Sequence, residues 1–151
     1  CHLNDFASGE IEIHECGVSD EERHMVLSYP ADATWLGTLS DDARQGSLRE
    51  QQRGSFEYKT VKVVAIDKIA HIQHKPNALW KLDTEGHEAL VILGAMETIR
   101  KYKPTLVLEL RPTDQQSTRL VKLLTSLDYS VSPLRLPFTK KITNIIAIPN
   151  L

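Results

Sequence analysis

The feature of this sequence that most limits its fold is the run Thr-Leu-Val-Leu-Glu-Leu at positions 105–110, directly after Pro104. A strand that is almost entirely apolar is typical of a parallel sheet covered by helices on both faces. Residues 58–66 and 78–82 are similarly rich in β-branched or apolar side chains, and we expect both segments to be strands as well. These three segments predict a sheet at the centre of the molecule.

Helical periodicity alternates with the strands in the second half of the chain. After residue 88, apolar side chains recur with the spacing of one helix face: Ala89, Ile92, Leu93, Met96 and Ile99. This spacing predicts a single helix, and a second helix is expected over 113–127. Two final strands are expected over 129–134 and 142–148. The order indicates an α/β fold with a parallel sheet that is flanked by helices.

The first half of the chain has a weaker pattern. We expect short strands over 11–18 and 25–29, followed at 31–56 by a polar segment with no sustained period, which we interpret as a loop excursion. Asp67 is expected to cap a short helix that extends to about residue 72. The 151 residues predict one domain, 1–151.

Composition excludes several classes of function. Lys and Arg number 18 against 20 Asp and Glu, a net charge of −2, so we expect neither a nucleic acid nor an anionic membrane surface as partner. No apolar run is long enough for a transmembrane helix. With only Cys1 and Cys16, a disulfide framework is not expected, and a reduced, cytoplasmic protein is the prediction.

Carboxylates stand where two of the expected parallel strands end. Asp83 follows the strand at 78–82, and Glu109 lies near the end of the strand at 105–110. Ligands of open α/β sheets bind at this end of the strands. With Glu85 and Glu88 nearby, the acids could bind a divalent cation, orient a hydroxyl or accept its proton. Glu85 and Glu88 could equally do no more than cap the following helix.

Several segments resemble one enzyme family in sequence and in order. They are Trp80-Lys81-Leu82-Asp83-Thr84-Glu85-Gly86-His87-Glu88, then Leu93-Gly94-Ala95, then Lys103-Pro104-Thr105-Leu106-Val107-Leu108-Glu109. Together they resemble the FkbM-type S-adenosylmethionine-dependent methyltransferases. Weaker similarities at 15–20, 63–69 and 145–149 extend the resemblance over nearly the whole chain except 31–56. It implies a partial Rossmann-like class I methyltransferase sheet, mostly parallel with a terminal antiparallel strand and flanked by helices.

The resemblance also implies roles for particular residues. Asp83 would lie nearest the transferred methyl group and the acceptor, with Glu85 and Glu109 as orienting or base partners. The cofactor, S-adenosylmethionine, would be bound by Gly17, Ser19, Asp20 and Asp83, with Ser19 and Asp20 on the adenine side. The acceptor would be a hydroxyl of a small molecule or carbohydrate, and no metal is expected.

Two departures from the family pattern limit these expectations. His87 stands where the family usually has a small residue, and the glycine-rich loop after the first strand is absent from these 151 residues. We therefore expect the chain to be the C-terminal portion of a methyltransferase domain, inactive by itself, with the missing N-terminal half of that domain as a partner. The strand at 78–82 should then have a bare edge. Alternatives are a non-catalytic α/β interaction module derived from a methyltransferase, and a divalent-metal-dependent hydrolase that uses the acidic cluster.

Overall fold

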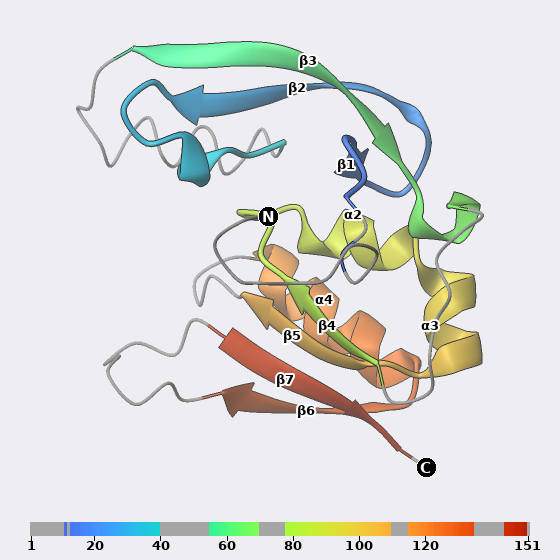
Figure 1. Cartoon of the computed structure of the whole chain (residues 1–151). Helices are drawn as coiled ribbons and strands as arrows, with labels where there is room; N and C mark the ends of the chain where they lie inside the picture. The colour runs from blue at the N-terminus through green and yellow to red at the C-terminus, as the bar shows by residue number, and fades with distance from the viewer. Residues whose placement is uncertain are drawn as a thin grey trace.

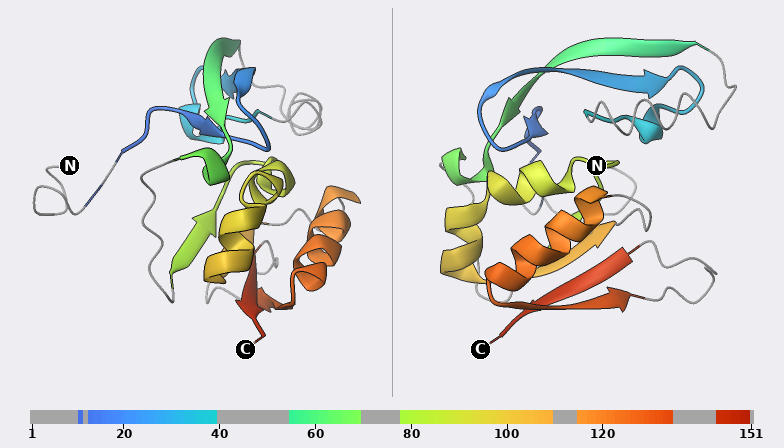
Figure 2. Two further views of the ribbon diagram at one scale, coloured as in Figure 1. Left: turned by 90° about the vertical axis from the view of Figure 1, so that its right-hand side faces the viewer. Right: turned by 180° about the vertical axis from the view of Figure 1, so that it is seen from behind.

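The computed structural model describes residues 11, 13–39, 55–69, 78–109, 115–134 and 144–150. These residues form two sheets, one of three strands and one of four. The first helix that follows strand β4 runs between them, below the long hairpin of the three-stranded sheet (Figures 1 and 2). An α/β fold is thus confirmed, with its strands divided between two sheets.

The four-stranded sheet has the order β4-β5-β7-β6. Its strands are β4 (Leu79–Leu82), β5 (Thr105–Glu109), β6 (Tyr129–Leu134) and β7 (Asn144–Pro149). Strands β4 and β5 are parallel, but β7 is antiparallel to both of its neighbours. The expectation of a mostly parallel sheet is therefore wrong. The connection at 135–143 is shorter than the dozen or more residues that a parallel crossover needs, so β7 returns antiparallel to β6.

In the part of the chain that the structure describes, three α-helices accompany this sheet: α2 (Glu88–Leu93), α3 (Met96–Tyr102) and α4 (Gln115–Ser126). Helix α4 crosses one face of the sheet, as the view from behind shows most clearly (Figure 2). The core is shared by α2, α3, α4 and the four strands and consists of Leu82, Val91, Ile92, Ala95, Ile99, Leu106, Leu108, Leu120, Leu124, Leu127, Tyr129, Ile145 and Ala147. None of the helices in the described ranges is both long and apolar enough to cross a membrane.

The expected single helix after residue 88 is broken between α2 and α3. The carbonyl of Gly94 accepts a hydrogen bond from the backbone N–H of Asp67 at 2.9 Å. The carboxylate of Asp67 accepts two more, at 2.9 Å each, from the N–H groups of Glu97 and Thr98 in the first turn of α3. Because the chain restarts as α3, Leu93 is 46% exposed rather than part of the core stripe.

Asp67 therefore caps a different helix from the one expected. It lies within a short 3₁₀ helix, η2 (Ile66–Lys68), and Ile69 is already extended. The prediction of a helix up to residue 72 is wrong, because the helical turn ends at Lys68, before Ile69. Residues 70–72 lie outside the described residues.

The three-stranded sheet has the order β1-β3-β2 and contains β1 (Gly17–Val18), β2 (Arg23–Pro30) and β3 (Phe56–Val64). Strand β1 is parallel to β3, and β2 is antiparallel to it over its whole length. The two long strands form a hairpin that extends beyond the rest of the molecule (Figure 1). The strand expected over 11–18 is reduced to the two residues of β1.

The first part of the expected excursion at 31–56 is ordered. A 3₁₀ helix, η1 (Thr34–Leu36), follows β2, and Thr38 then forms an antiparallel bridge with Ser28. The two residues exchange backbone hydrogen bonds of 2.9 and 3.0 Å. The expected excursion therefore contains a short 3₁₀ helix and a bridge back to β2, and residues 40–54 lie outside the described residues.

Candidate functional site

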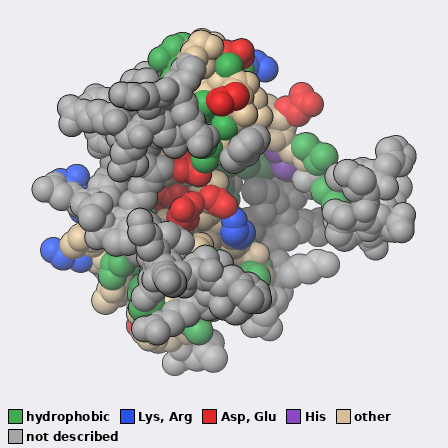
Figure 3. Space-filling view, turned by 90° about the vertical axis from the view of Figure 1, so that its left-hand side faces the viewer, with side chains coloured by type: hydrophobic (Ala, Val, Ile, Leu, Met, Phe, Trp, Pro, Cys, Tyr) green, Lys and Arg blue, Asp and Glu red, His purple; other side chains and the backbone are tan. Residues whose placement is uncertain are grey.

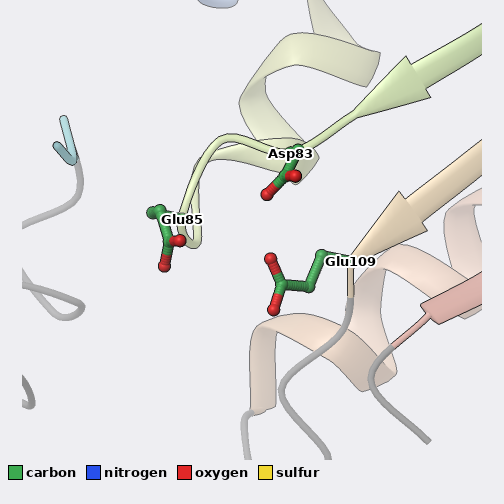
Figure 4. Close-up of side chains that lie close together, drawn as sticks. All are labelled: Asp83, Glu85 and Glu109. Atoms are coloured by element: carbon green, nitrogen blue, oxygen red, sulfur yellow. The ribbon is translucent and has the colours of Figure 1, made fainter. Parts of the chain in front are cut away.

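Asp83 and Glu109 lie side by side where β4 and β5 end. The strands are parallel, and Leu82 is paired with Leu108, so the next residue of each strand emerges at the same edge of the sheet. Both leucines are buried, which fixes the strand ends that carry the two acids. The sequence-based expectation that these carboxylates meet at one sheet edge is confirmed (Figure 4).

Glu85 joins them from the loop between β4 and α2. Its backbone has φ of 52° and that of Gly86 has φ of 96°, so the chain passes through two consecutive left-handed residues, which only glycine adopts without strain. This turn brings the Glu85 carboxylate toward the other two (Figure 4), and one oxygen from each of Asp83, Glu85 and Glu109 lies within 4.8 Å of the others. Acidic side chains are visible in the middle of the face that lies on the left in Figure 1 (Figure 3).

Glu88 has a different role from the other three acids. Its side chain is buried, and its Oε1 accepts hydrogen bonds from the Thr84 N–H at 2.9 Å, the Thr84 hydroxyl at 3.0 Å and the Gly86 N–H at 3.3 Å. These bonds hold the loop that carries Glu85. Of the alternatives left open for Glu88, the contacts therefore favour a local structural role at the start of α2.

The acids differ in proton affinity. A hydrogen bond with Lys81 and another with Glu109 hold the pKa of Asp83 below its usual value. Burial, the hydrogen bond with Asp83 and the negative charges of the neighbouring acids raise the pKa of Glu109 to about 7. Near neutral pH Glu109 is therefore partly protonated and donates to ionised Asp83, so that the cluster can hold and release one proton.

Ser19 and Asp20 form a second polar group, at the end of β1. The buried Ser19 hydroxyl donates to Asp20 Oδ1 at 2.8 Å. Arg23 donates to the same oxygen at 2.8 Å and to Ser19 Oγ at 3.3 Å. Partial burial opposes ionisation of Asp20, but the hydrogen bonds from Ser19 and Arg23 prevail and lower its pKa.

His87 connects this group to the loop of Glu85, and the sequence reasoning gave it no role. It is only 3% exposed, and its Nε2 lies 3.0 Å from Ser19 Oγ. Because the Ser19 hydroxyl donates to Asp20, the His87 N–H is the donor in this contact. Burial, followed by the charge of Arg23, lowers the pKa of His87, so the ring is neutral near pH 7. The sequence signal that could have pointed to His87 is that the family usually has a small residue at this position.

Two glycines near Ser19 serve close packing. A Cβ on Gly17 would lie 2.9 Å from Val63 Cγ1 and 3.3 Å from Leu39 Cδ1, and a Cβ on Gly94 would lie 2.0 Å from the carbonyl oxygen of Ser19. Gly17, expected to bind the cofactor, thus packs β1 against β3. Gly94 lets the break between α2 and α3 rest directly on the Ser19 backbone.

Comparison with known proteins identifies the family. The model of the methyltransferase FkbM domain matches residues 4–131. The chain belongs to the FkbM methyltransferase family. A comparison with curated proteins gave no match.

A solved structure has a similar fold. It is the crystal structure of methyltransferase FkbM from Methylobacillus flagellatus KT, with a TM-score of 0.55 and 21% sequence identity. The similarity covers 90% of this chain and 28% of that one, so this FkbM-family chain spans little more than a quarter of the length of the structure it matches.

Proposed function

We propose that the protein transfers a methyl group from S-adenosylmethionine to a hydroxyl of a small-molecule or carbohydrate acceptor. The observation that carries this proposal is the convergence of Asp83, Glu85 and Glu109 at the ends of two parallel strands. Membership of the FkbM methyltransferase family supports methyl transfer in general. The finer points, the cofactor and the acceptor class, rest on the chemistry of the residues.

The side chains present are suited to S-adenosylmethionine. The cofactor carries a positive sulfonium, which the carboxylates of Asp83, Glu85 and Glu109 complement in charge. The partly exposed carboxylate of Asp20 has lone pairs available for an amino group such as that of adenine. We therefore assign Asp20 to the adenine side and Asp83 to the sulfonium side. When bound, the cofactor supplies an electrophilic methyl group.

The acids of the cluster are assigned separate tasks toward the acceptor. Ionised Asp83 accepts a hydrogen bond from the acceptor hydroxyl and orients it. Glu109, with a pKa of about 7, is suited to take the hydroxyl proton, because a general base works best when its pKa is near the working pH. Glu85 adds a further acceptor for a neighbouring hydroxyl. A set of carboxylates disfavours anionic acceptors, which supports a neutral polyhydroxyl substrate.

We also propose that a strand from the N-terminal half of the methyltransferase domain pairs with β4. Within the described residues, β4 has β5 on one side and no strand on the other, while β1 lies in a separate sheet. Unpaired N–H and C=O groups along a strand readily accept another strand. Because the glycine-rich loop is absent from these 151 residues, the chain by itself should bind S-adenosylmethionine no more tightly than about millimolar, measured by calorimetry.

The test of the proposed function uses the full-length protein with labelled S-adenosylmethionine and a panel of neutral sugars beside glucuronate. Asp83→Asn and Glu109→Gln keep the side-chain shape but remove the charge, so turnover should fall by about 10²–10⁴-fold with little change in cofactor affinity. The matched control is Glu97→Gln, an exposed acid on α3, which should transfer methyl groups at the wild-type rate.

Other outcomes would refute the assignment. Wild-type turnover in both variants would refute the catalytic roles of Asp83 and Glu109 and leave the cluster a structural role. The non-catalytic interaction module would be favoured if the wild-type protein itself transferred no methyl group. Methyl transfer that is lost with a chelator and restored by a divalent ion would assign the acids to a metal ion and not to a general base, since a carboxylate base needs no metal.

A further inference from the structure

The segment after β2 reaches from the hairpin to the acidic loop. Thr38 is 5% exposed, and its backbone is fixed to Ser28 of β2 by the two hydrogen bonds of their bridge. Its hydroxyl donates to the carbonyl oxygen of Glu85 at 2.9 Å. A residue of the expected loop excursion thus contacts the backbone of a candidate catalytic residue.

This contact acts where the loop backbone is least favourable. Glu85 is a non-glycine residue at φ of 52°, a conformation that persists only when surrounding contacts hold it. Glu88 holds the residues on either side, Thr84 and Gly86, through their N–H groups. Thr38 holds Glu85 itself, through its carbonyl. The loop is therefore fixed from α2 on one side and from the hairpin on the other.

We propose that Thr38 is a positioning residue for Glu85, and that the β2–β3 hairpin, to which Thr38 is bridged, thereby contributes to the geometry of the acceptor site. The hydroxyl of Thr38 fixes the Glu85 peptide and so directs the Glu85 carboxylate toward Asp83 and Glu109. The catalytic half of this inference rests on the proposed function. The half that concerns the order of the loop stands on the contacts alone.

A pair of variants separates the hydroxyl from the bulk of the side chain. Thr38→Val keeps the volume, the β-branch and the backbone bridge to Ser28 but removes the donor to Glu85. Thr38→Ser keeps the donor and removes only a methyl group. Thr60→Val, on an exposed position of β3, is the matched control for a threonine-to-valine change in the hairpin.

The first measurement is amide hydrogen exchange in the full-length protein. In Thr38→Val the amides of Thr84 and Gly86 should exchange about tenfold faster, while the amides of Ile99 and Leu106 in the core remain unchanged. Thr38→Ser and Thr60→Val should match the wild type within about twofold. Unchanged loop exchange in Thr38→Val would overturn the inference, and so would an equal acceleration in the core, which would mean general destabilisation.

The second measurement is methyl transfer by the same proteins. Thr38→Val should lower kcat about tenfold at unchanged KM for S-adenosylmethionine, with recovery in Thr38→Ser. Wild-type kcat in Thr38→Val would overturn the positioning role. If the wild type transfers no methyl group, the proposed function fails, and the exchange measurement alone decides whether Thr38 orders the loop.

Discussion

The four-stranded sheet and the β2–β3 hairpin are stabilised in different ways. Around the four-stranded sheet, large side chains such as Leu106, Leu108 and Leu124 are fully buried. In the hairpin, by contrast, Val26 and Tyr58 are exposed to 42% and 57%. Hydrophobic burial therefore stabilises the sheet that carries Asp83 and Glu109, whereas backbone pairing largely maintains the hairpin. Asp83 and Glu109 are thus carried by the sheet with the buried core, while the segment that follows β2 contacts the loop of Glu85 through the hydroxyl of Thr38.

The largest expected effect is the difference in stability loss when a side chain is truncated in each of the two regions. Leu108→Ala should lower the free energy of unfolding by about 2–5 kcal/mol, because it leaves a cavity in a core that cannot fully collapse. Val61→Ala, at a half-buried position of β3, should cost less than about 1 kcal/mol. Urea unfolding of both variants measures the difference. Equal losses would mean that the hairpin is packed as well as the core.

The next effect concerns the junction of the two regions. Gly94→Ala should cost about 1–3 kcal/mol, because its Cβ would lie 2.0 Å from the Ser19 carbonyl oxygen and the backbone must shift. Gly37→Ala is the control, since its Cβ would meet nothing closer than 3.4 Å and its φ is −66°. Thermal unfolding compares the two. A neutral Gly94→Ala would show that β1 and the helix break are not in close contact.

The smallest expected effect is a pH dependence of the stability, which arises from Glu109 on the four-stranded sheet. Its pKa is about 7 in the folded chain against an ordinary 4.5, so between these values the folded state holds more protons than the unfolded state. Stability should therefore fall as pH rises from about 4.5 to about 7, by about 1 kcal/mol after solvent screening.

Glu109→Gln should remove this part of the pH profile, measured as the urea midpoint across that range. The lowered pKa of Asp83 has the opposite sign, because its contribution is lost only as pH falls below about 4. A wild-type profile that is flat between pH 4.5 and 7 would contradict the raised pKa of Glu109.

Elements with a strong local pattern were predictable from the sequence. The apolar run of β5, the leucine stripe of α4 and the boundaries of β6 are confirmed within a few residues, since burial and periodicity encode them locally. The meeting of Asp83 with Glu109 was predictable for the same reason, because two parallel strands bring their ends together.

Features that depend on distant residues were not predictable. The break at Gly94 is held by hydrogen bonds with Asp67, which lies far from it in sequence, and a single glycine is tolerated within many helices, so the local sequence alone did not predict it. The roles of Thr38 and His87 depend on hydrogen bonds to Glu85 and Ser19. Neither residue belongs to a local pattern of its own, so only the folded arrangement gives them a function.

The central place of β7 between β5 and β6 has a consequence for the order of folding during synthesis. Strands β5 and β6 are made first but do not pair with each other, so the four-stranded sheet cannot close until residues 144–149 have left the ribosome. The β2–β3 hairpin is complete once residue 64 has emerged. The β2–β3 hairpin can therefore form early. Until β7 is synthesised, β5 has an unpaired edge that exposes the nascent chain to aggregation.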